Sequence, residues 1–330
     1  EHFGGSDGEY ASVDASVRPP GRGAAVIPFI RDPDATPGRC DRLSPRVRRV
    51  MANNPGPFTY TGTATYLVGH GGPGAQTAVI DPGPPDPEHL AALLAALEGE
   101  TVTHILLTHT HRDHAPLAGP LAEATGAPVL AAPPPGAQIH ASEAGGPALD
   151  EGDAEDFAQH GVLVHGDRIA GPGWTLEVLA TPGHASNHLA FALLEENGLF
   201  AGDHVMGWST TVVAPPDGDM AAYMASLEQV IARDFEVIWP AHGPPIPAPR
   251  DFLAAYRAHR LIREAQILER LRAGDRAIPD MVRTLYADTD PRLWPAAALS
   301  VWAHLIQLAG DGRASADPAP TLAAAYRPAR

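Results

Sequence analysis

Short apolar segments, each ending at glycine, proline or polar residues, run through the first half of the chain. Residues 58–69 alternate small polar and apolar side chains, which is typical of a strand. Residues 86–98 carry leucines at helical spacing with acidic residues in the first turn, which predicts a helix. Residues 46–52 fit either a short helix or an edge strand. The other elements expected in this half are strands at 77–81, 101–107 and 127–132 and a helix at 115–125.

In the second half, several apolar segments run directly into polar residues. One ends in Thr-Pro-Gly-His at 181–184, another in Asp203, and a third in Ala-His-Gly at 241–243. Strands that repeatedly end in such side chains suggest a layered α/β sandwich with its site along one edge of the sheets. The elements expected here are strands at 161–165, 174–180, 189–194, 199–203 and 235–240 and a helix at 219–233.

Two regions depart from this regular pattern and help to set the expected domain limits. Residues 1–22 are polar and glycine-rich without a period, which predicts a disordered N-terminal segment. Residues 133–160 are rich in proline, glycine and acids, which predicts a long loop that could act as a lid. We therefore expect a catalytic domain over 23–250 and a mostly helical, arginine-rich domain over 251–330.

The segment Thr-His-Thr-His-Arg-Asp-His at 108–114 gathers metal-binding side chains just after an expected strand. Imidazole nitrogens and carboxylate oxygens are ligands for zinc, and an extended backbone points His109 and His111 to one side. Asp113 and His114 lie past the bend, so one segment could serve two metals. A lone histidine at a strand end is usually only a satisfied polar group, but four such residues together favour a metal. His104, inside the strand, is instead expected to be packed or hydrogen-bonded.

Charge and composition restrict the chemistry further. The 330 residues carry a formal net charge of −16, and all 23 basic residues are arginines. A mechanism that needs lysine is therefore excluded, and an anionic substrate group must be held by arginine, backbone N–H groups or metal. The acidic balance also disfavours non-specific binding to nucleic acid.

The expected location is the cytoplasm. The single cysteine, Cys40, cannot form an internal disulfide, which fits a reducing compartment. The first ten residues lack a basic start and an apolar stretch, so we expect no signal peptide. No apolar run approaches the roughly 20 residues that span a bilayer, so no membrane association is expected.

Taken together, these motifs resemble the metallo-β-lactamase superfamily over about residues 55–250. The motifs, in the order that the family shows, are DPG at 81–83, THTHRDH at 108–114, TPGH at 181–184, AGDH at 201–204 and PAHG at 240–243. The resemblance implies an αββα four-layer sandwich with a binuclear metal site.

The resemblance also implies a role for each matching residue. His109, His111 and His184 would bind the first metal, and Asp113, His114 and His242 the second. Asp203 would bridge the two ions, and Asp81 would orient the metal loop from outside the ligand set. The implied cofactors are two Zn²⁺ ions, although the same ligands accept manganese or iron.

The implied reaction is hydrolysis by a hydroxide held between the two metals. Zinc lowers the pKa of bound water to about 7, and two ions about 3.5–4 Å apart can clamp a carbonyl or phosphoryl centre. Asp113 and Asp203 are the candidate catalytic carboxylates: Asp203 as the bridge, and Asp113 as a ligand that could also orient the nucleophile. An aspartate at 203 departs from the cysteine-liganded β-lactamases, so a housekeeping hydrolase is favoured over antibiotic resistance.

The C-terminal part points to one branch of this superfamily. The strand at 58–69 and the segment Y-R-A-H-R-L-I-R-E-A-Q-I-L at 256–268 resemble β-lactamase-like hydrolases with a C-terminal winged-helix tail, here reaching about residue 312. Residues 277–286 and 296–308 are consistent with such a helical tail.

Several further residues keep two interpretations. His188 is expected to be structural rather than catalytic, and His204 to point away from the metals or to line the pocket. His259 could reach the site or only pack within its helix. The sequence fits two positions equally well for Trp208, Ser209 and Thr210: the wall of the substrate pocket, or a loop without a functional role. The spacing of the charged residues favours a solvent-exposed helix face over an RNA-binding surface for the arginines at 257, 260, 263, 270 and 272.

Three functions remain as hypotheses. The first is a binuclear zinc hydrolase of a small thioester, lactone or ester. The second is a metal-dependent endoribonuclease on single-stranded RNA, which the winged-helix tail favours and the −16 charge opposes. The third is a binding protein with a vestigial metal site, which predicts missing ligands although every ligand position is filled. The oligomeric state is left open.

Overall fold

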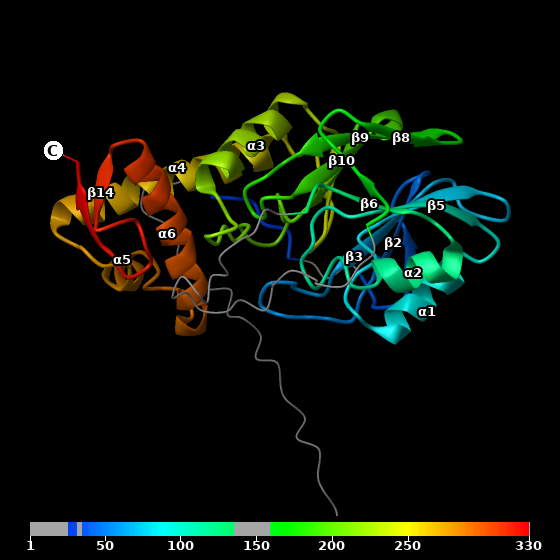
Figure 1. Ribbon diagram of the computed structural model, residues 1–330, viewed down its shortest axis with the longest axis horizontal. Helices are drawn as coiled ribbons and strands as arrows, with labels where there is room; N and C mark the ends of the chain where they lie inside the picture. The colour runs from blue at the N-terminus through cyan, green and yellow to red at the C-terminus, as the bar shows by residue number, and fades with distance from the viewer. Residues whose placement is uncertain (1–25, 32–34, 135–158, 330) are drawn as a thin grey trace, which may run out of the picture.

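A computed structural model describes residues 26–31, 35–134 and 159–329 of the chain. The predicted disorder of 1–22 and nearly all of the predicted loop at 133–160 fall outside these residues. Figure 1 shows two parts, a sandwich of two sheets with helices on its outer faces and a smaller C-terminal part. The helices are α1 (Pro87–Ala96), α2 (Ala118–Thr125), α3 (Met220–Ala232), α4 (Arg250–Ala273), α5 (Ile278–Leu285) and α6 (Trp294–Gly310), with short 3₁₀ turns at Leu194–Glu196 and Pro291–Leu293.

The first sheet runs in the order β1-β2-β3-β4-β5-β6-β7. Its first four strands pair antiparallel, and β4 to β7 pair parallel. The parallel half follows from the crossover helices α1 and α2, which return the chain to the same end of the sheet. The strands are β1 (Cys40–Arg42), β2 (Val47–Met51), β3 (Ala64–Val68), β4 (Gln76–Ile80), β5 (Thr101–Leu106), β6 (Val129–Ala131) and β7 (Gly161–Val162).

The second sheet runs in the order β13-β12-β11-β10-β9-β8. It is antiparallel except for β11 and β12, which are parallel because α3 connects them. Its strands are β8 (Arg168–Gly171), β9 (Trp174–Ala180), β10 (Leu189–Leu193), β11 (Gly198–Gly202), β12 (Val237–Pro240) and β13 (Ile246–Pro247).

Three apolar clusters hold the four layers of the sandwich together. Side chains such as Tyr66 and Phe191 fill the space between the two sheets. The helices α1 and α2 cover the outer face of the first sheet, for example through Leu93. The helices α3 and α4 cover the outer face of the second sheet, for example through Tyr223 and Phe252. The αββα architecture predicted from the sequence is confirmed.

A fourth cluster forms the C-terminal part, where α4, α5 and α6 pack against a hairpin of β14 (Ala314–Asp317) and β15 (Ala325–Pro328). The sequence predicted a mostly helical domain over 251–330 with a winged-helix tail reaching about 312, and the hairpin lies beyond that tail. Tyr326 is fully buried in the cluster, so the hairpin is part of the same core. The long helix α4 contributes its first turns to the sandwich and its last turns to this part.

Two other predicted elements differ from the structure. Residues 47–51 form neither a helix nor an edge strand, because β2 is fully buried between β1 and β3. The strand expected over 58–69 is confined to β3, because the residues before it form a turn. In that turn Tyr60 has φ +58° and the Asn54 side chain hydrogen-bonds Thr63.

One helix of the described residues, Pro291–Gly310, has the length and apolar composition of a membrane span. Burial accounts for its apolar composition, because residues such as Leu299, Trp302 and Leu305 lie in the core of the C-terminal part. We therefore assign it to the core. The cytoplasmic location stays a prediction.

Candidate metal centre

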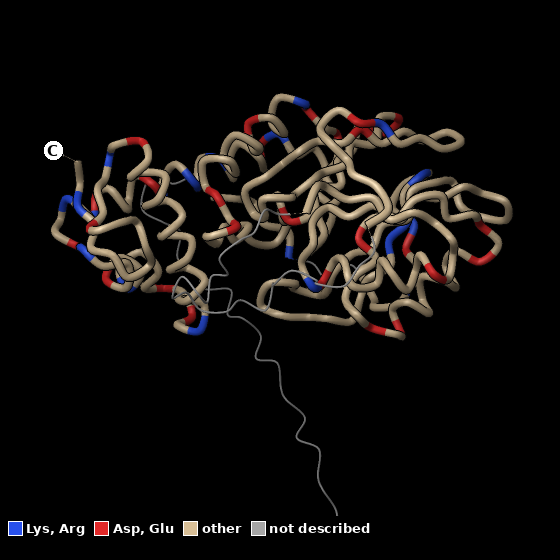
Figure 2. Tube along the Cα trace, in the orientation of Figure 1, with Lys and Arg blue, Asp and Glu red and all other residues tan. Residues whose placement is uncertain are grey.

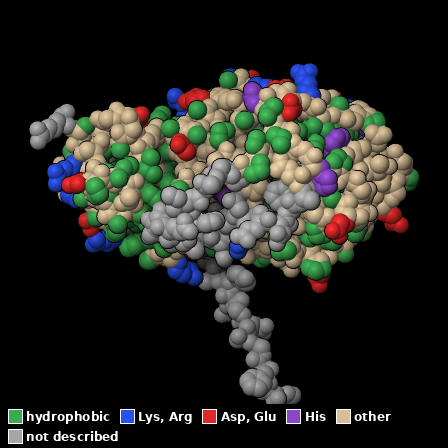
Figure 3. All heavy atoms as spheres, in the orientation of Figure 1, with side chains coloured by type: hydrophobic (Ala, Val, Ile, Leu, Met, Phe, Trp, Pro, Cys, Tyr) green, Lys and Arg blue, Asp and Glu red, His purple; other side chains and the backbone are tan. Residues whose placement is uncertain are grey.

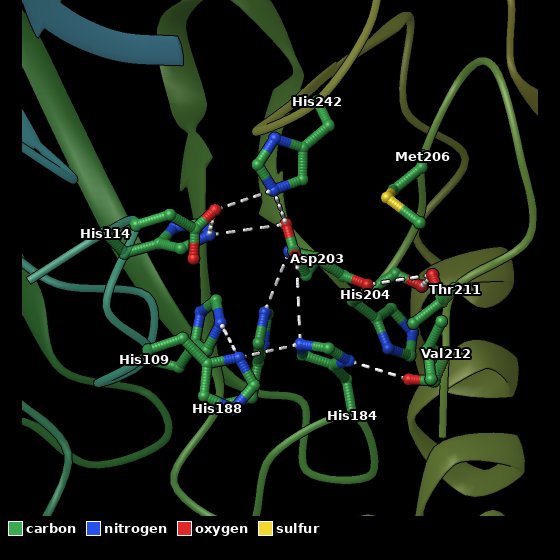
Figure 4. Close-up of polar contacts among 12 residues, drawn as sticks. His109, His114, His184, His188, Asp203, His204, Met206, Thr211, Val212 and His242 are labelled. Atoms are coloured by element: carbon green, nitrogen blue, oxygen red, sulfur yellow. Dashed lines mark hydrogen bonds and ion pairs between the residues drawn. The ribbon is translucent and has the colours of Figure 1, made fainter. Parts of the chain in front are cut away.

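The seven ligands predicted from the sequence converge at the ends of four strands. His109, His111, Asp113 and His114 follow β5, and His184 follows β9. Asp203 follows β11 and His242 follows β12. Figure 4 labels five of these residues and shows His109, His114, His184 and His242 around Asp203.

Three imidazoles form the first group of candidate ligands. The Nε2 atom of His109 lies 2.9 Å from Nδ1 of His111, and Nε2 of His184 lies 3.2 Å from the same atom. All three side chains are buried. Three ring nitrogens this close cannot all be satisfied by sharing protons with one another, whereas a single cation would accept all three lone pairs.

The second group combines two imidazoles with a carboxylate. Oδ2 of Asp113 lies 3.3 Å from Nε2 of His114 and 3.2 Å from Nε2 of His242. Asp203 stands between the groups, with Oδ1 3.2 Å from Nε2 of His242 and Oδ2 3.6 Å from Nε2 of His184. Its two carboxylate oxygens therefore face different groups, as a bridging ligand requires.

Two unsatisfied atoms indicate that these residues fit metal ions. Within the described part of the chain, Nε2 of His114 and Oδ1 of Asp203 are buried without a hydrogen-bond partner, although they lie only 3.6 Å apart. Leaving such groups unpaired is costly, and a cation between them would remove that cost. The nitrogen and oxygen donor set suits zinc and also accepts manganese or iron.

The electrostatics of the centre also favour cations. Burial and neighbouring imidazoles lower the pKa of His109 well below its usual value, and lower that of His111 to about 3. Burial opposes ionisation of Asp113 and Asp203 as well, but adjacent histidines hold the pKa of both carboxyls below the usual range. For His242, burial is outweighed by Asp203 and Asp113, which raise its pKa to about 10. The site thus keeps the carboxylates of Asp113 and Asp203 ionised, which is the form that binds a metal ion.

Asp81 fixes the metal loop from behind, as the sequence predicted. It accepts hydrogen bonds from the backbone N–H of Thr108 (2.8 Å) and from the Thr108 hydroxyl (2.7 Å), and it pairs with Nδ1 of His114 at 2.9 Å. The last contact leaves Nε2 of His114 directed into the centre. Partners of this kind set the tautomer and orientation of a metal-binding histidine.

His188 has a structural role, as expected. Its Nδ1 lies 2.8 Å from the hydroxyl of Thr181, and its Nε2 accepts a hydrogen bond from the backbone N–H of Asp203 at 3.1 Å. It therefore holds the backbone of Asp203, the residue that stands between the two groups of candidate ligands. His104 is half-buried in β5 and contacts the hydroxyl of Thr103 at 3.1 Å, which agrees with the predicted packing role.

The loop after β11 forms a second support, and sequence reasoning missed its anchor. Nδ1 of His184 pairs with the carbonyl of Val212 at 2.7 Å, and the Thr211 hydroxyl donates to the carbonyl of Asp203 at 2.8 Å. The buried hydroxyl of Tyr256, on α4, accepts from the Thr211 N–H at 2.7 Å and donates to the Ser209 carbonyl at 2.9 Å. One phenol thus holds the loop that positions the two candidate ligands His184 and Asp203 (Figure 4 labels Met206, Thr211 and Val212 of this loop).

A small cavity opens beside the centre. The structure brings Trp208, Ser209 and Thr210 to its wall together with His184 and Asp203. The sequence had left these three residues open between wall and loop. The cavity also includes residues that no local pattern pointed to, namely Pro57, Phe58, Met206 and Val212.

The two remaining candidate residues lie away from this wall. His204 is fully buried and packs on the ring of Tyr223, with centroids 4.9 Å apart, so it points away from the ligands (Figure 4). His259 lies on α4 next to Arg260 and is not among the described residues that line the cavity.

The arginines of α4 require a correction. They were expected on a solvated face, but Arg260 is only 3% exposed and donates to the carbonyl of Thr211. One feature of the sequence does indicate that Arg260 is buried: it lies on the apolar stripe of α4, one helical turn after Tyr256. Arg257 and Arg270 do form surface ion pairs, with Glu228 and Asp275.

Comparison with known proteins identifies the class that this fold and site define. Residues 59–242 match the model of the metallo-beta-lactamase superfamily, and residues 277–319 match the beta-lactamase associated winged helix domain. The chain therefore belongs to the metallo-β-lactamase superfamily and is a hydrolase with a C-terminal winged-helix domain.

Particular relatives share nearly the whole chain. It is 33% identical to "Beta-lactamase-like protein 2 homolog" of Caenorhabditis elegans, over 82% of this chain and 87% of the relative. It is also 33% identical to "Atrochrysone carboxyl ACP thioesterase" of Aspergillus chevalieri, over 82% of this chain and 83% of the relative. A crystal structure of a metallo-beta-lactamase family protein from Thermus thermophilus has the same fold, with a TM-score of 0.70, 24% identity, and coverage of 87% of this chain and all of that one.

Proposed function

We propose that the protein is a binuclear metal-dependent hydrolase of acyl substrates, with thioesters as the favoured class and lactones and other esters as related substrates. One observation carries the proposal. The carboxylate of Asp203 stands between two groups of ligands, with one oxygen toward each group. Such an arrangement suits two ions that share one bridging residue.

In this proposal each group of residues holds one zinc ion. His109, His111 and His184 hold the first, and Asp113, His114 and His242 hold the second. Two bound ions would supply an activated water at neutral pH and stabilise negative charge on the substrate oxygen. Manganese or iron would fit the same donors.

The chain's own residues then orient the centre and form the wall of its cavity. Asp113 accepts a hydrogen bond from the Thr63 hydroxyl at 3.1 Å, which fixes the carboxylate beside His114 and His242. Trp208 stacks on Tyr60 with ring centroids 4.9 Å apart and so gives the cavity a rigid aromatic wall. An apolar wall next to the Asp203 carboxylate suits an uncharged acyl group better than an anionic one.

Thioesters are favoured over RNA for two reasons. Relatives at 33% and 31% identity are named as thioesterases of an acyl carrier protein. The net charge of −16 opposes a polyanion, and Figure 2 shows acidic and basic positions interspersed over both parts. On the face drawn in Figure 3, basic side chains likewise lie scattered near the edges.

The test compares substrates on one preparation of metal-loaded protein. Acetyl-pantetheine, a lactone panel and labelled single-stranded RNA are incubated in parallel with the wild type and with His111→Ala. We expect thioester turnover that His111→Ala abolishes, intact RNA, and two metal ions per chain by elemental analysis. RNA cleavage that depends on His111, with no acyl turnover, would overturn the acyl assignment. A metal content well below two after reconstitution would overturn the binuclear centre.

A further inference from the structure

A second cluster of buried polar side chains lies outside the metal centre, where the two parts of the protein meet. Figure 1 shows α4 passing from the sandwich into the C-terminal part, and α6 packs against it. Arg260 and His304 are only 3% and 1% exposed. His259 and Arg263 are partly buried on the same stretch of α4. We call Arg260, Arg263, His259 and His304 the junction cluster.

The charges within the junction cluster are all of one sign. Apart from burial, the neighbours that lower the pKa of His304 to about 3 are Arg260, Arg263 and His259. Both arginines likewise help to lower the pKa of His259 to about 3. Of the described acids nearby, Glu264 pairs with Arg313 and Glu228 with Arg257. The cluster therefore has no described carboxylate partner.

Many of its hydrogen-bonding atoms also lack partners. Among the described residues, the Nε atoms of both arginines, Nδ1 of His259 and both ring nitrogens of His304 are buried without a hydrogen bond. Among the described residues, Arg260 donates to the Thr211 carbonyl and lies over the ring of Tyr223, 4.9 Å from its guanidinium carbon. Arg263 contacts the Leu285 carbonyl at 3.1 Å and the Tyr286 ring at 4.2 Å. Buried guanidinium groups without a carboxylate are costly unless an anion joins them.

The cluster adjoins the active-site cavity through a single loop. Arg260 binds the carbonyl of Thr211, whose neighbours Thr210 and Val212 line that cavity. An anionic group at the cluster would thus lie just behind the wall of the acyl site. Because the chain contains no lysine, arginine is the only side chain that could hold such a group by full positive charge at neutral pH.

We propose that the junction cluster binds a phosphate ester group, and that this group belongs to the carrier arm of a thioester substrate. The arginines supply charge-assisted hydrogen bonds in the planar geometry that phosphate oxygens accept, and the histidines add neutral N–H donors. The identity of the carrier rests on the proposed thioester hydrolysis, whereas the affinity for phosphate does not.

The experiment uses the metal-loaded protein and three variants. Arg263→Gln and His304→Asn remove donors from the cluster, and Arg257→Gln removes an exposed, ion-paired guanidinium from the same helix as a matched control. Calorimetry measures the affinity for inorganic phosphate. Phosphate bound at the metal centre contributes equally in every variant, so differences between variants report on the junction cluster. Kinetics compare acetyl-coenzyme A with acetyl-pantetheine, which share the acyl group and the thiol but differ in phosphate.

We expect Arg263→Gln to weaken inorganic phosphate about tenfold and to raise KM for acetyl-coenzyme A about tenfold at unchanged kcat. His304→Asn should act in the same direction by a smaller factor, while acetyl-pantetheine and Arg257→Gln should show no change. Equal phosphate affinity in the wild type and both cluster variants would overturn the phosphate site. An equal KM shift for both thioesters would also overturn it, because it would indicate a role in positioning the loop.

The two proposals fail in distinguishable ways. If no thioester is hydrolysed but phosphate binding still depends on Arg263, the acyl function fails and the phosphate site stands. If single-stranded RNA binds in an Arg263-dependent way while acetyl-coenzyme A does not, the carrier assignment is overturned in favour of a nucleic-acid phosphate.

Discussion

This protein contains two groups of buried histidines, which differ in the charge of the side chains around them. In the metal centre carboxylates lie beside His242, and Asp203 and Asp113 raise its pKa to about 10 despite burial, whereas the pKa of His111, which lies among other imidazoles, is lowered to about 3. The junction cluster surrounds its imidazoles with arginines, so that burial and the guanidinium charges lower the pKa of His304 to about 3.

The difference shows how the sign of the neighbouring charge decides what a buried histidine can do. Beside carboxylates, imidazole nitrogens join a mixed nitrogen and oxygen donor set of the kind that binds cations. Beside guanidinium groups, the same side chain stays neutral and adds a donor to a site of net positive charge. The comparison therefore predicts opposite ligands for the two clusters, and the following changes test it from the largest expected effect to the smallest.

Removing the shared carboxylate should have the largest effect. In Asp203→Asn the amide keeps the size of the side chain but cannot bridge two cations. We expect turnover to fall by at least about a hundredfold and the metal content to drop below two per chain. Asp219→Asn is the matched control. Residue 219 is the N-cap of α3 and lies outside the centre, and Asn caps a helix about as well as Asp does. Unchanged metal content in Asp203→Asn would contradict the bridging role.

Loosening the metal loop should have a smaller effect of the same kind. Asp81→Asn keeps one acceptor but weakens the contacts to Thr108 and His114. Loss of such a supporting partner typically costs roughly 10–100-fold in metal affinity. Competition with a chelator measures this affinity. Asp86→Asn, at the N-cap of α1, should leave it unchanged, and equal effects of the two changes would argue against a specific role for Asp81.

Supplying the junction cluster with an acid should remove the contrast between the two clusters. Gln307 lies one helical turn after His304, and its buried Oε1 has no hydrogen-bond partner among the described residues. We expect Gln307→Glu to weaken binding of inorganic phosphate about tenfold, because the new carboxylate repels the anion and competes for the arginines. Calorimetry checks the affinity, and unchanged or tighter phosphate binding would contradict a cationic site.

Acid should destabilise the metal-free protein through the neutral histidines. The folded-state pKa of His304 is about 3, below the ordinary value of 6.5, so only the unfolded chain takes up a proton between these values. Stability is therefore full above pH 6.5 and falls as the pH is lowered toward 3. We expect His304→Leu to reduce this loss by about 1–3 kcal/mol between pH 6.5 and roughly 4.5, as measured by urea unfolding. Parallel pH curves for the two proteins would contradict a neutral His304.

The sequence allowed the sandwich and the positions of its candidate ligands to be predicted because both are encoded locally. Strands ending at His109, His184, Asp203 and His242 carry their chemistry at fixed places in the chain, and the structure brings all four together. The buried position of β2 was not predicted, since its two central arginines resemble an exposed edge.

The supports of the centre were harder to foresee, because they depend on packing between distant segments. Tyr256 meets Thr211 and Ser209 across 45 and 47 residues, and no local pattern specifies such a contact. Arg260 was misjudged for a related reason. Charge suggested an exposed position, whereas its place on the apolar stripe of α4 indicated a buried one.

The long helix α4 has a consequence for how the molecule can be divided. Its 24 residues would extend about 36 Å, and its apolar side chains belong to the core of the sandwich at one end and of the winged-helix domain at the other. A cut near residue 250 would remove Phe252 and Tyr256 from the sandwich core. The sandwich core therefore extends past residue 250 into α4, and we expect the two parts to unfold in a single cooperative transition.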